Sequence, residues 1–344
     1  MRARSVPFVL GGLVAVVALV ALVAACGQPV ESGTGARPLS ALAASAGAER
    51  HGPCSASVGV VPDSGCPGGG SSVGGCAVFP ADNAWNTDVS GLPTDPRSAA
   101  VIAEIQATGG KFVHPDFGSD PTYGIPYVVV PASQAAIPIT YAAYGSESDP
   151  GPFPIPLNTP VESGSDAHVV VVQQGSCQLF ELFAARVAGG GWVADSGARW
   201  NLSSNALRTE GWTSADAAGL PILPGLVRYD EAVSGHIGHA LRFTVARTRI
   251  GRVHPATHDA ATSTDPNAPP MGLRLRLRAD FDRASFTGLS RTVLDALATY
   301  GMIVADNGSN WYISGSTDTR WDDGDLNQLK GVPGTAFEVV STGA

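Results

Sequence analysis

The stretch HVVVVQQGSCQLFELFAARV, residues 168–187, decides the fold class. It contains two apolar runs, 168–172 and 179–187, separated by turn-forming residues around Gly175. Runs of this length that are rich in β-branched and aromatic residues and bounded by turns are typical of β-strands. Similar runs lie at 127–130, 239–246, 273–278, 302–305, 311–314 and 336–340. The sequence therefore predicts a mainly β protein.

Helical periodicity is limited to about 98–107, 226–233, 289–300 and 323–330. Because strands and helices do not alternate regularly, a doubly wound α/β sheet is disfavoured. We expect an antiparallel β-sandwich of jelly-roll-like type with a few packed helices. No low-complexity segment follows Cys76, so residues 76–344 are expected to form a single globular domain.

Residues 1–25 have the features of a signal peptide, which are a basic start at Arg2 and Arg4, an apolar run and small residues before Cys26. The Val-Ala-Ala-Cys ending resembles the bacterial lipobox, which implies lipidation of Cys26. An uncleaved transmembrane helix is the alternative, since about 20 apolar residues can span a bilayer. Residues 27–75 contain no Phe, Trp or Tyr, so we expect 26–75 to be a lipidated cysteine followed by a flexible tether. The protein would then be exported and anchored to the outer face of the bacterial cytoplasmic membrane.

The charge balance argues against nucleic acid as a partner. The 344 residues carry 21 Lys+Arg against 30 Asp+Glu, a formal net charge of −9, and the only lysines are Lys111 and Lys330. Nucleic-acid binding requires a dense positive face that neutralises phosphates. We therefore expect no nucleic-acid partner, and contact with the membrane only through the lipid anchor.

The cysteines agree with export. Four remain after Cys26, an even number that is typical of disulfides in an oxidising compartment. Three pairings are open, and we favour Cys76 with Cys177 and Cys54 with Cys66. A metal site is the alternative, but the chain has no Cys-x-x-Cys pair.

Several long motifs resemble a family of secreted bacterial and fungal proteins to which no activity is assigned. They are FPADNAWN (79–86), SDPGP (148–152), GWTSADAAGLPILPGL (211–226), RYDE (228–231), HALRFT (239–244) and ADNGSNWY (305–312). The resemblance covers most of residues 77–341 and keeps the order of the motifs. It implies export and a shared fold, and it carries over no catalytic residue.

The densest chemical stretch runs from 228 to 258. We select Tyr229, Asp230, Glu231, His239 and His258 as candidate catalytic residues, because acids, histidine and tyrosine serve as general acids and bases. We expect at least two residues of the set Asp230, Glu231, His239 and His258 to line a cleft.

A zinc site is a competing interpretation of the same stretch. It contains His236-x-x-His239 and His254-x-x-x-His258, and zinc favours imidazole ligands. No His-Glu-x-x-His arrangement accompanies them. We therefore expect no metal and no cofactor, with zinc or calcium as the less favoured alternative.

Arginine and tryptophan supply candidate substrate-binding groups. Arg274 and Arg276 alternate with leucines, which places them on one face of a predicted strand, and Arg242 follows the HALRFT strand start. Guanidinium groups bind carboxylate or sulfate on an anionic polysaccharide, unless they pair with neighbouring acids instead. Trp212 and Trp311 are flanked by short polar residues, as tryptophans that stack on sugars in loops are, although core packing explains most tryptophans.

These observations predict a cell-surface lipoprotein that acts on extracellular polysaccharide as a glycoside hydrolase or a polysaccharide lyase. A hydrolase needs two nearby carboxylates. The candidate acids are Glu181, Asp195, Asp216, Asp230, Glu231 and Asp306. A lyase instead uses a histidine or tyrosine base with arginine. The alternatives are a non-catalytic glycan- or wall-binding lipoprotein and, less favoured, a metal-dependent hydrolase.

Overall fold

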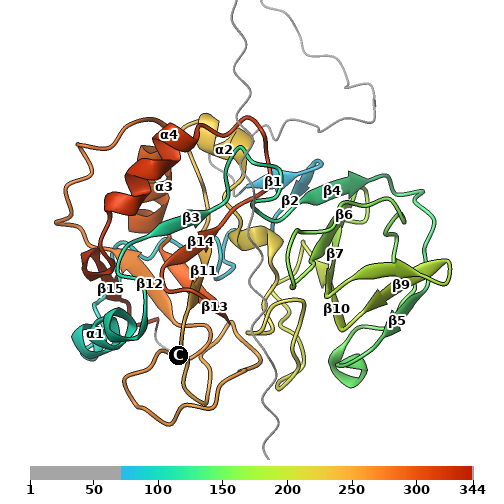
Figure 1. The fold of residues 1–344 in the computed structure, drawn as a ribbon, viewed down its shortest axis with the longest axis horizontal. Coiled ribbons are helices and arrows are strands. Elements are labelled where there is room, and N and C mark those ends of the chain that lie inside the picture. Colours follow the sequence, from blue (N-terminus) through green and yellow to red (C-terminus); the bar gives the residue numbers. More distant parts are fainter. Residues whose placement is uncertain (1–70, 343–344) are drawn as a thin grey trace, which may run out of the picture. The chain divides into compact units, whose positions relative to one another are not determined.

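The computed structural model describes residues 71–342. The described chain is mainly β, with 26% strand and 17% helix, and has several mostly antiparallel sheets and four helices (Figure 1). The predicted mainly β, sandwich-like class with few helices is confirmed. Cys26, the signal peptide and the predicted Cys54–Cys66 pair lie outside the described residues. No helix within residues 71–342 has the length and apolar character needed to cross a membrane.

The stretch 168–187 supplies the two central strands, β6 and β7, of a four-stranded sheet with the order β10-β7-β6-β4. The strands are β4 (Tyr127–Val130), β6 (Val169–Gln173), β7 (Gln178–Phe183) and β10 (Ser196–Asn201). β6 and β7 are antiparallel, with Val171 opposite Phe180. Gly175 in the connecting turn has a φ of 75°, a conformation that glycine adopts without steric cost.

Both faces of β6 are buried, which explains its unbroken run of four valines. Successive side chains of a strand point to opposite faces of its sheet. Val170 and Val172 pack into the larger of two hydrophobic cores, while Val169 and Val171 pack into a smaller core that includes Trp192. β6 therefore lies between the two cores and contributes side chains to both.

The second large sheet has six strands in the order β15-β12-β13-β11-β14-β3. They are β3 (His114–Asp116), β11 (Leu241–Val245), β12 (Arg274–Leu277), β13 (Met302–Asn307), β14 (Tyr312–Ser314) and β15 (Phe337–Val339). β11 is parallel to β13 and antiparallel to β14, and its register with β13 shifts between Phe243 and Thr244. This sheet supplies four of the elements that carry the candidate site.

Two smaller sheets complete the β structure of the described residues. One has the order β5-β9-β8, and the other is a hairpin of β1 and β2. Their strands are β1 (Ser72–Val73), β2 (Cys76–Ala77), β5 (Ile139–Tyr141), β8 (Arg186–Ala188) and β9 (Gly191–Ala194). The predicted run 179–187 divides into β7 and β8 because Ala184 between them has a φ of 50°. The predicted Cys76–Cys177 disulfide is present and joins β2 to the turn that follows β6.

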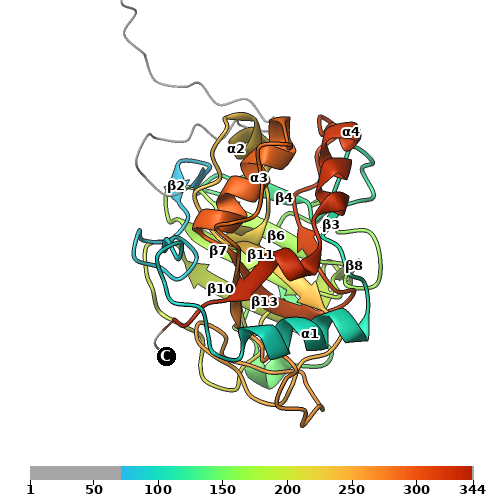
Figure 2. The same cartoon turned by 90° about the vertical axis from the view of Figure 1, so that its left-hand side faces the viewer.

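The helices cover the six-stranded sheet and its ends. They are α1 (Ser98–Thr108), α2 (Tyr229–Val233), α3 (Gly288–Thr299) and α4 (Asp323–Leu326), with short 3-10 turns η1 (Gly145–Glu147), η2 (Leu223–Gly225), η3 (Asn327–Gly331) and η4 (Gly334–Ala336). α1 packs against β15, and α3 packs against β12 and α2 (Figure 2). α2 begins three residues later than the predicted helix 226–233, because Arg228 before it has an extended backbone.

Candidate functional site

A polar cleft with a volume of about 340 Å³ opens beside the six-stranded sheet. We call it the acidic cleft and define it by six titratable residues that line it: Asp116, Glu162, Asp166, His168, Arg242 and Asp306. Asp116 ends β3, Arg242 lies on β11 and Asp306 lies near the end of β13, while the other three come from the segment that leads into β6. The cleft therefore joins residues that are up to 190 positions apart in the chain.

Arg242 organises the base of the acidic cleft. Its Nε and Nη2 atoms donate to the two carboxylate oxygens of Asp216 over 2.6 and 2.9 Å, and its Nη1 atom donates to Ser314 Oγ over 2.7 Å. Its Nη2 atom also contacts an oxygen of Asp306 at 3.2 Å. Burial alone would lower the pKa of Arg242, but the paired Asp216 carboxylate raises it, so this guanidinium stays charged. Two carboxyl groups thus share one buried cation.

Asp306 is the carboxyl group that this cation does not fully neutralise. Burial raises its pKa from the usual 3.8 to about 7, and the negative charge of Asp216 acts in the same direction. The Arg242 charge and the backbone N–H of Asn307 oppose the rise. Because 22% of its side chain remains exposed to the cleft, Asp306 can hold a proton near neutral pH and pass it to a ligand.

His168 and Glu162 form a second buried pair in the acidic cleft. His168 Nδ1 lies 2.5 Å from Glu162 Oε2, and His168 Nε2 lies 2.9 Å from the carbonyl oxygen of Ala215. A carbonyl oxygen only accepts, so Nε2 carries a proton. Burial would lower the pKa of His168, but the Glu162 carboxylate more than offsets this and raises it. The arrangement is therefore an imidazolium beside an ionised carboxylate.

Glu162 remains ionised although it is largely buried. Burial acts to raise its pKa, but the hydrogen bond and charge of His168 lower it below the usual value. Its side chain keeps 18% of its surface exposed. The acidic cleft consequently contains one carboxyl that binds a proton near neutral pH, Asp306, and one that does not, Glu162. Such separation of two carboxyl pKa values is the usual sign of an acid–base pair.

Other groups complete the cleft. Burial raises the pKa of the Asp116 carboxyl, and this carboxyl forms no hydrogen bond or ion pair within residues 71–342. Tyr312 lines the cleft and stacks on His114 with the ring centroids 4.2 Å apart. Tyr123 also lines it and is 53% exposed. Aromatic faces beside carboxyl groups suit a ligand that is polar at its edges and apolar on its faces, as a sugar ring is.

The five predicted catalytic residues lie elsewhere, and none of them lines the acidic cleft. Glu231 caps the start of α2, where it accepts from the backbone N–H of Arg228 over 3.0 Å and from its Nη2 atom over 2.6 Å. His239 Nε2 lies 3.0 Å from Glu231 Oε1, the oxygen that also accepts from the Arg228 backbone N–H, and both residues are buried. These two residues contact each other and hold the start of α2 in place.

Of the remaining three predicted catalytic residues, Asp230 and Tyr229 contact the same arginine, and His258 contacts a different part of the chain. Asp230 accepts from Arg320 over 2.8 Å, and the same guanidinium lies 4.2 Å from the ring centroid of Tyr229. His258 Nδ1 lies 2.7 Å from the carbonyl oxygen of Ala217. No group of three or more His, Cys, Asp or Glu side chains within residues 71–342 is arranged to hold a metal ion. The histidine spacings therefore do not assemble a metal site in the described part of the chain.

The arginine ladder on β12 is also used inside the protein. Arg274 donates to the carbonyl oxygens of Tyr300, Ala84 and Thr87, and burial lowers its pKa to about 9. Arg276 pairs with Glu338 and donates to the carbonyl oxygens of Val89, Ser90 and Leu92. Both are buried, so they fasten the segment 84–92 to the sheet and present no free guanidinium to a polysaccharide. Pairing with neighbouring groups, the alternative interpretation, accounts for these contacts.

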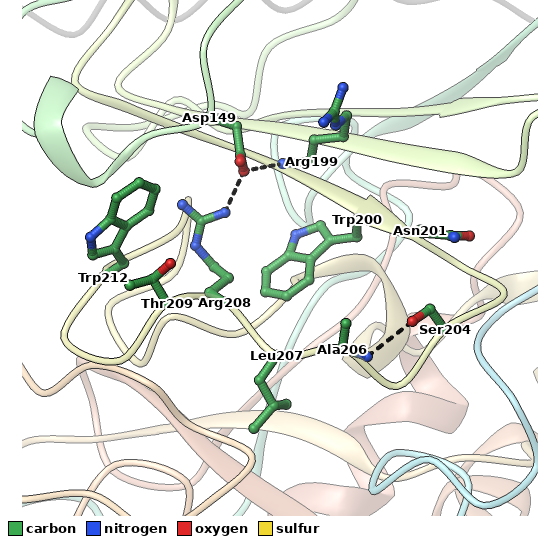
Figure 3. A pocket seen from close by; sticks show the side chains of 10 residues that line it. All are labelled: Asp149, Arg199, Trp200, Asn201, Ser204, Ala206, Leu207, Arg208, Thr209 and Trp212. Atoms are coloured by element: carbon green, nitrogen blue, oxygen red, sulfur yellow. Dashed lines mark hydrogen bonds and ion pairs between the residues drawn. The ribbon is translucent and has the colours of Figure 1, made fainter.

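The two selected tryptophans have different surroundings. Trp311 is fully buried and stacks between Phe243 and Phe337, so it belongs to the core. Trp212 is half-buried and lines a second pocket, together with Trp200 and Arg208 (Figure 3). Among the predicted substrate-binding residues, Arg242 thus lies at the acidic cleft and Trp212 at a different pocket.

Sequence reasoning missed His168, Glu162 and Asp116. Asp216 and Asp306 were candidates only as members of a larger pool of acids. Glu162 and His168 had a weak local signal, because a charged residue six positions before a histidine at the start of an apolar run can turn back onto it. Asp116 lies on a three-residue strand that contains proline and gave no strand signal.

No family model, curated protein or solved structure matches this chain. The function is therefore inferred from the geometry of the acidic cleft.

Proposed function

We propose that the protein is a glycoside hydrolase that acts on extracellular polysaccharide, with Asp306 as the proton donor and Glu162 as the ionised carboxylate. The observation that carries the proposal is the convergence of these two carboxyl groups on one cleft, each next to a different buried cation. Asp306 and Asp216 both contact Arg242, whereas Glu162 pairs with His168. The opposite directions of their pKa shifts support the assignment.

The roles follow from the two protonation states. Asp306 donates its proton to the glycosidic oxygen as the bond from that oxygen to the anomeric carbon breaks. The negative charge of Glu162 stabilises the positive charge that develops on the sugar ring. Water then supplies the hydroxyl group that the anomeric carbon gains, and the proton that this water releases returns to the Asp306 carboxylate. Arg242 touches Asp306 and holds its carboxyl in place, while Asp216 holds Arg242.

The same contacts make a lyase mechanism less suitable. A lyase needs a free base and a cation that neutralises the uronate carboxylate of its substrate. Both nitrogens of His168 are engaged, and Arg242 is buried with its donors bound to Asp216, Asp306 and Ser314. The cleft also carries more acidic than basic lining residues, which opposes an anionic substrate. We therefore propose hydrolysis, and a neutral rather than an anionic glycan.

The proposed location remains the one that the N-terminal sequence suggests, namely attachment through Cys26 outside the bacterial cytoplasmic membrane. Extracellular polysaccharide is the partner that such a location makes accessible. Mass spectrometry of the purified protein tests this part of the proposal, because lipidation adds a diacylglycerol to the cysteine. A chain that retains residues 1–25 without lipid would contradict it.

A polysaccharide panel tests the activity. We expect the full chain to release reducing ends from neutral glucans, xylans, mannans or chitin oligomers, without the ultraviolet absorbance of unsaturated uronates. Asp306→Asn should lower the rate by about 10²–10⁴-fold, the usual contribution of a general acid. Asp280→Asn is the matched control, because Asp280 is exposed and pairs with Arg278 outside the cleft. Full activity of Asp306→Asn, or no cleavage of any glycan, would contradict the proposal.

A further inference from the structure

A second pocket lies where β10, Asp149 and the segment 204–212 meet (Figure 3). Its volume is about 210 Å³, the space of roughly seven water molecules. We call it the tryptophan pocket and define it by Trp200, Trp212, Arg208, Arg199 and Asp149. None of the residues that line it also lines the acidic cleft. It is therefore a separate candidate binding site.

The pocket is built around a guanidinium held between two indoles. The Arg208 Cζ atom lies 5.5 Å from the ring centroid of Trp200 and 5.8 Å from that of Trp212, distances that allow cation–π attraction to both rings. Arg208 donates to Asp149 Oδ2 over 2.6 Å and to the carbonyl oxygens of Thr213 and Glu147, each over 2.7 Å. Because every one of these contacts restrains Arg208, the two indoles are held in position before any ligand arrives.

Several polar groups at the pocket have hydrogen-bonding capacity left. The Arg199 guanidinium forms no hydrogen bond or ion pair within residues 71–342, but it is exposed and points away from Trp200, its neighbour on β10 (Figure 3). Asp149 uses only Oδ2, with Arg208 and the backbone N–H of Arg199, so its Oδ1 atom has no partner in that range. The Nε1 atom of Trp200 is buried without an acceptor in the described chain. A buried donor without a partner is costly, so an acceptor oxygen next to it would be stabilising.

These features match the surface of a sugar ring. An indole face suits the apolar C–H face of a pyranose, and the free Oδ1 atom of Asp149 can accept from a hydroxyl group. Leu207, which is 45% exposed, adds apolar surface at the same pocket. We propose that the tryptophan pocket binds a sugar ring of a neutral glycan, with Trp212 as the stacking platform and Asp149 as a hydrogen-bonding partner.

A neutral sugar is favoured over an anionic one by the carboxylate of Asp149. Its side chain is 26% exposed and carries the free acceptor oxygen of the pocket. A uronate would place a second carboxylate near it, whereas a hydroxyl group can donate to it. Arg199 is solvated, and exposed charge pairs contribute about 0–1 kcal/mol at most, so stacking and neutral hydrogen bonds decide the preference.

Titration calorimetry with the full chain tests this site. The probes are hexasaccharides of glucose, xylose, mannose and N-acetylglucosamine, and the protein carries Asp306→Asn so that binding is measured without cleavage. Trp212→Ala should weaken binding of the preferred hexasaccharide about tenfold, within the range of an aromatic contact. Leu207→Ala, which removes an exposed side chain of the pocket and cannot unfold the protein by opening its core, should weaken it severalfold. Phe112→Ala and Arg186→Ala are the matched controls, because both residues are exposed and lie outside the two binding regions.

The outcomes separate this proposal from the proposed catalytic function. Binding that depends on Trp212 and Leu207 supports the tryptophan pocket even when no polysaccharide is cleaved. Binding of none of the four hexasaccharides, or binding unchanged by both substitutions, would overturn it. Repeating the titration at about 0.01 M and 1 M salt tests the charge class, because screening weakens recognition of an anion and leaves a neutral sugar unaffected. Binding confined to uronate-containing chains and lost at high salt would overturn the neutral assignment.

Discussion

Replacing Asp306 by asparagine should change how the stability of the protein depends on pH. In the folded protein the pKa of Asp306 is raised from 3.8 to about 7. Between these two values the folded state binds a proton that the unfolded state has released. The free energy of unfolding should therefore fall as pH rises from about 4 to about 7, and the loss should be complete above pH 7.

The size of this change in the free energy of unfolding follows from the difference between the two pKa values. Each pH unit between them corresponds to about 1.4 kcal/mol, so the full difference is about 4 kcal/mol. The 22% exposure of the Asp306 side chain allows water to stabilise the charge, so we expect a measured value of about 2 kcal/mol. Asparagine does not titrate, so Asp306→Asn should lose this part of the pH dependence. Relative to the wild type, the free energy of unfolding of the variant should increase by about 2 kcal/mol between pH 4 and pH 8.

Urea denaturation at half-unit intervals from pH 4 to pH 8 measures this difference directly, and it requires no substrate. Comparing differences between variant and wild type cancels the contribution of other titrating groups, including Glu181, whose burial raises its pKa to about 7. Asp166→Asn, at an exposed position of the same cleft, is the control and should leave the shape of the profile unchanged. Parallel pH profiles for Asp306→Asn and the wild type would refute the account of Asp306 as a carboxyl that binds a proton near neutrality.

Other expectations concern activity, the disulfide, the arginine ladder and the tryptophan pocket. The rate of glycan hydrolysis should fall about tenfold per pH unit above pH 7, as Asp306 loses its proton, and a flat rate through pH 9 would contradict its role as the acid. Replacing Cys76 and Cys177 by alanine should lower the free energy of unfolding by about 4–5 kcal/mol, because the bond closes a loop of 101 residues, and urea denaturation under oxidising conditions tests this. Arg274→Leu should cost at least about 2 kcal/mol in the same assay, because buried carbonyl oxygens lose their donor, while KM stays unchanged; a raised KM with intact stability would instead indicate sugar binding. Trp212→Ala should raise KM for a polymer several-fold and leave hydrolysis of a short aryl glycoside unaffected, and equal effects on both substrates would contradict a separate pocket.

Local sequence pattern was sufficient for most of the β structure. The runs at 127–130, 168–172, 273–278 and 302–305 became β4, β6, β12 and β13 with shifts of no more than two residues at either end. β-Branched residues signal a strand wherever it is buried. The short strands β3, β5 and β8 gave no separate signal, because each has three residues and takes its order from pairing with distant strands.

The candidate site could be predicted only in part, because it is assembled over long distances. Arg242, which the sequence analysis selected as a substrate-binding residue, lies at the acidic cleft, but its partners Asp216 and Asp306 are 26 and 64 positions away. The parallel pairing of β11 with β13 brings Arg242 close to Asp306, and no periodicity in either strand reveals that pairing. Conversely, Glu231 and His239 are close in sequence and were selected as candidate catalytic residues, yet their contact stabilises the start of α2. A dense local cluster of titratable residues is thus a weak guide to a site.

Because β6 contributes side chains to both hydrophobic cores, it also determines how the described part of the protein should unfold. Val170 and Val172 belong to one core while Val169 and Val171 belong to the other, so neither core can open without exposing half of the same strand. A fold of two independent cores would allow one half to melt first. With a common strand, partial melting leaves the surviving half with a solvated face, and the free energies of the two halves become coupled. Amide hydrogens of β6 should therefore exchange only through global unfolding, and both halves should melt in one cooperative transition.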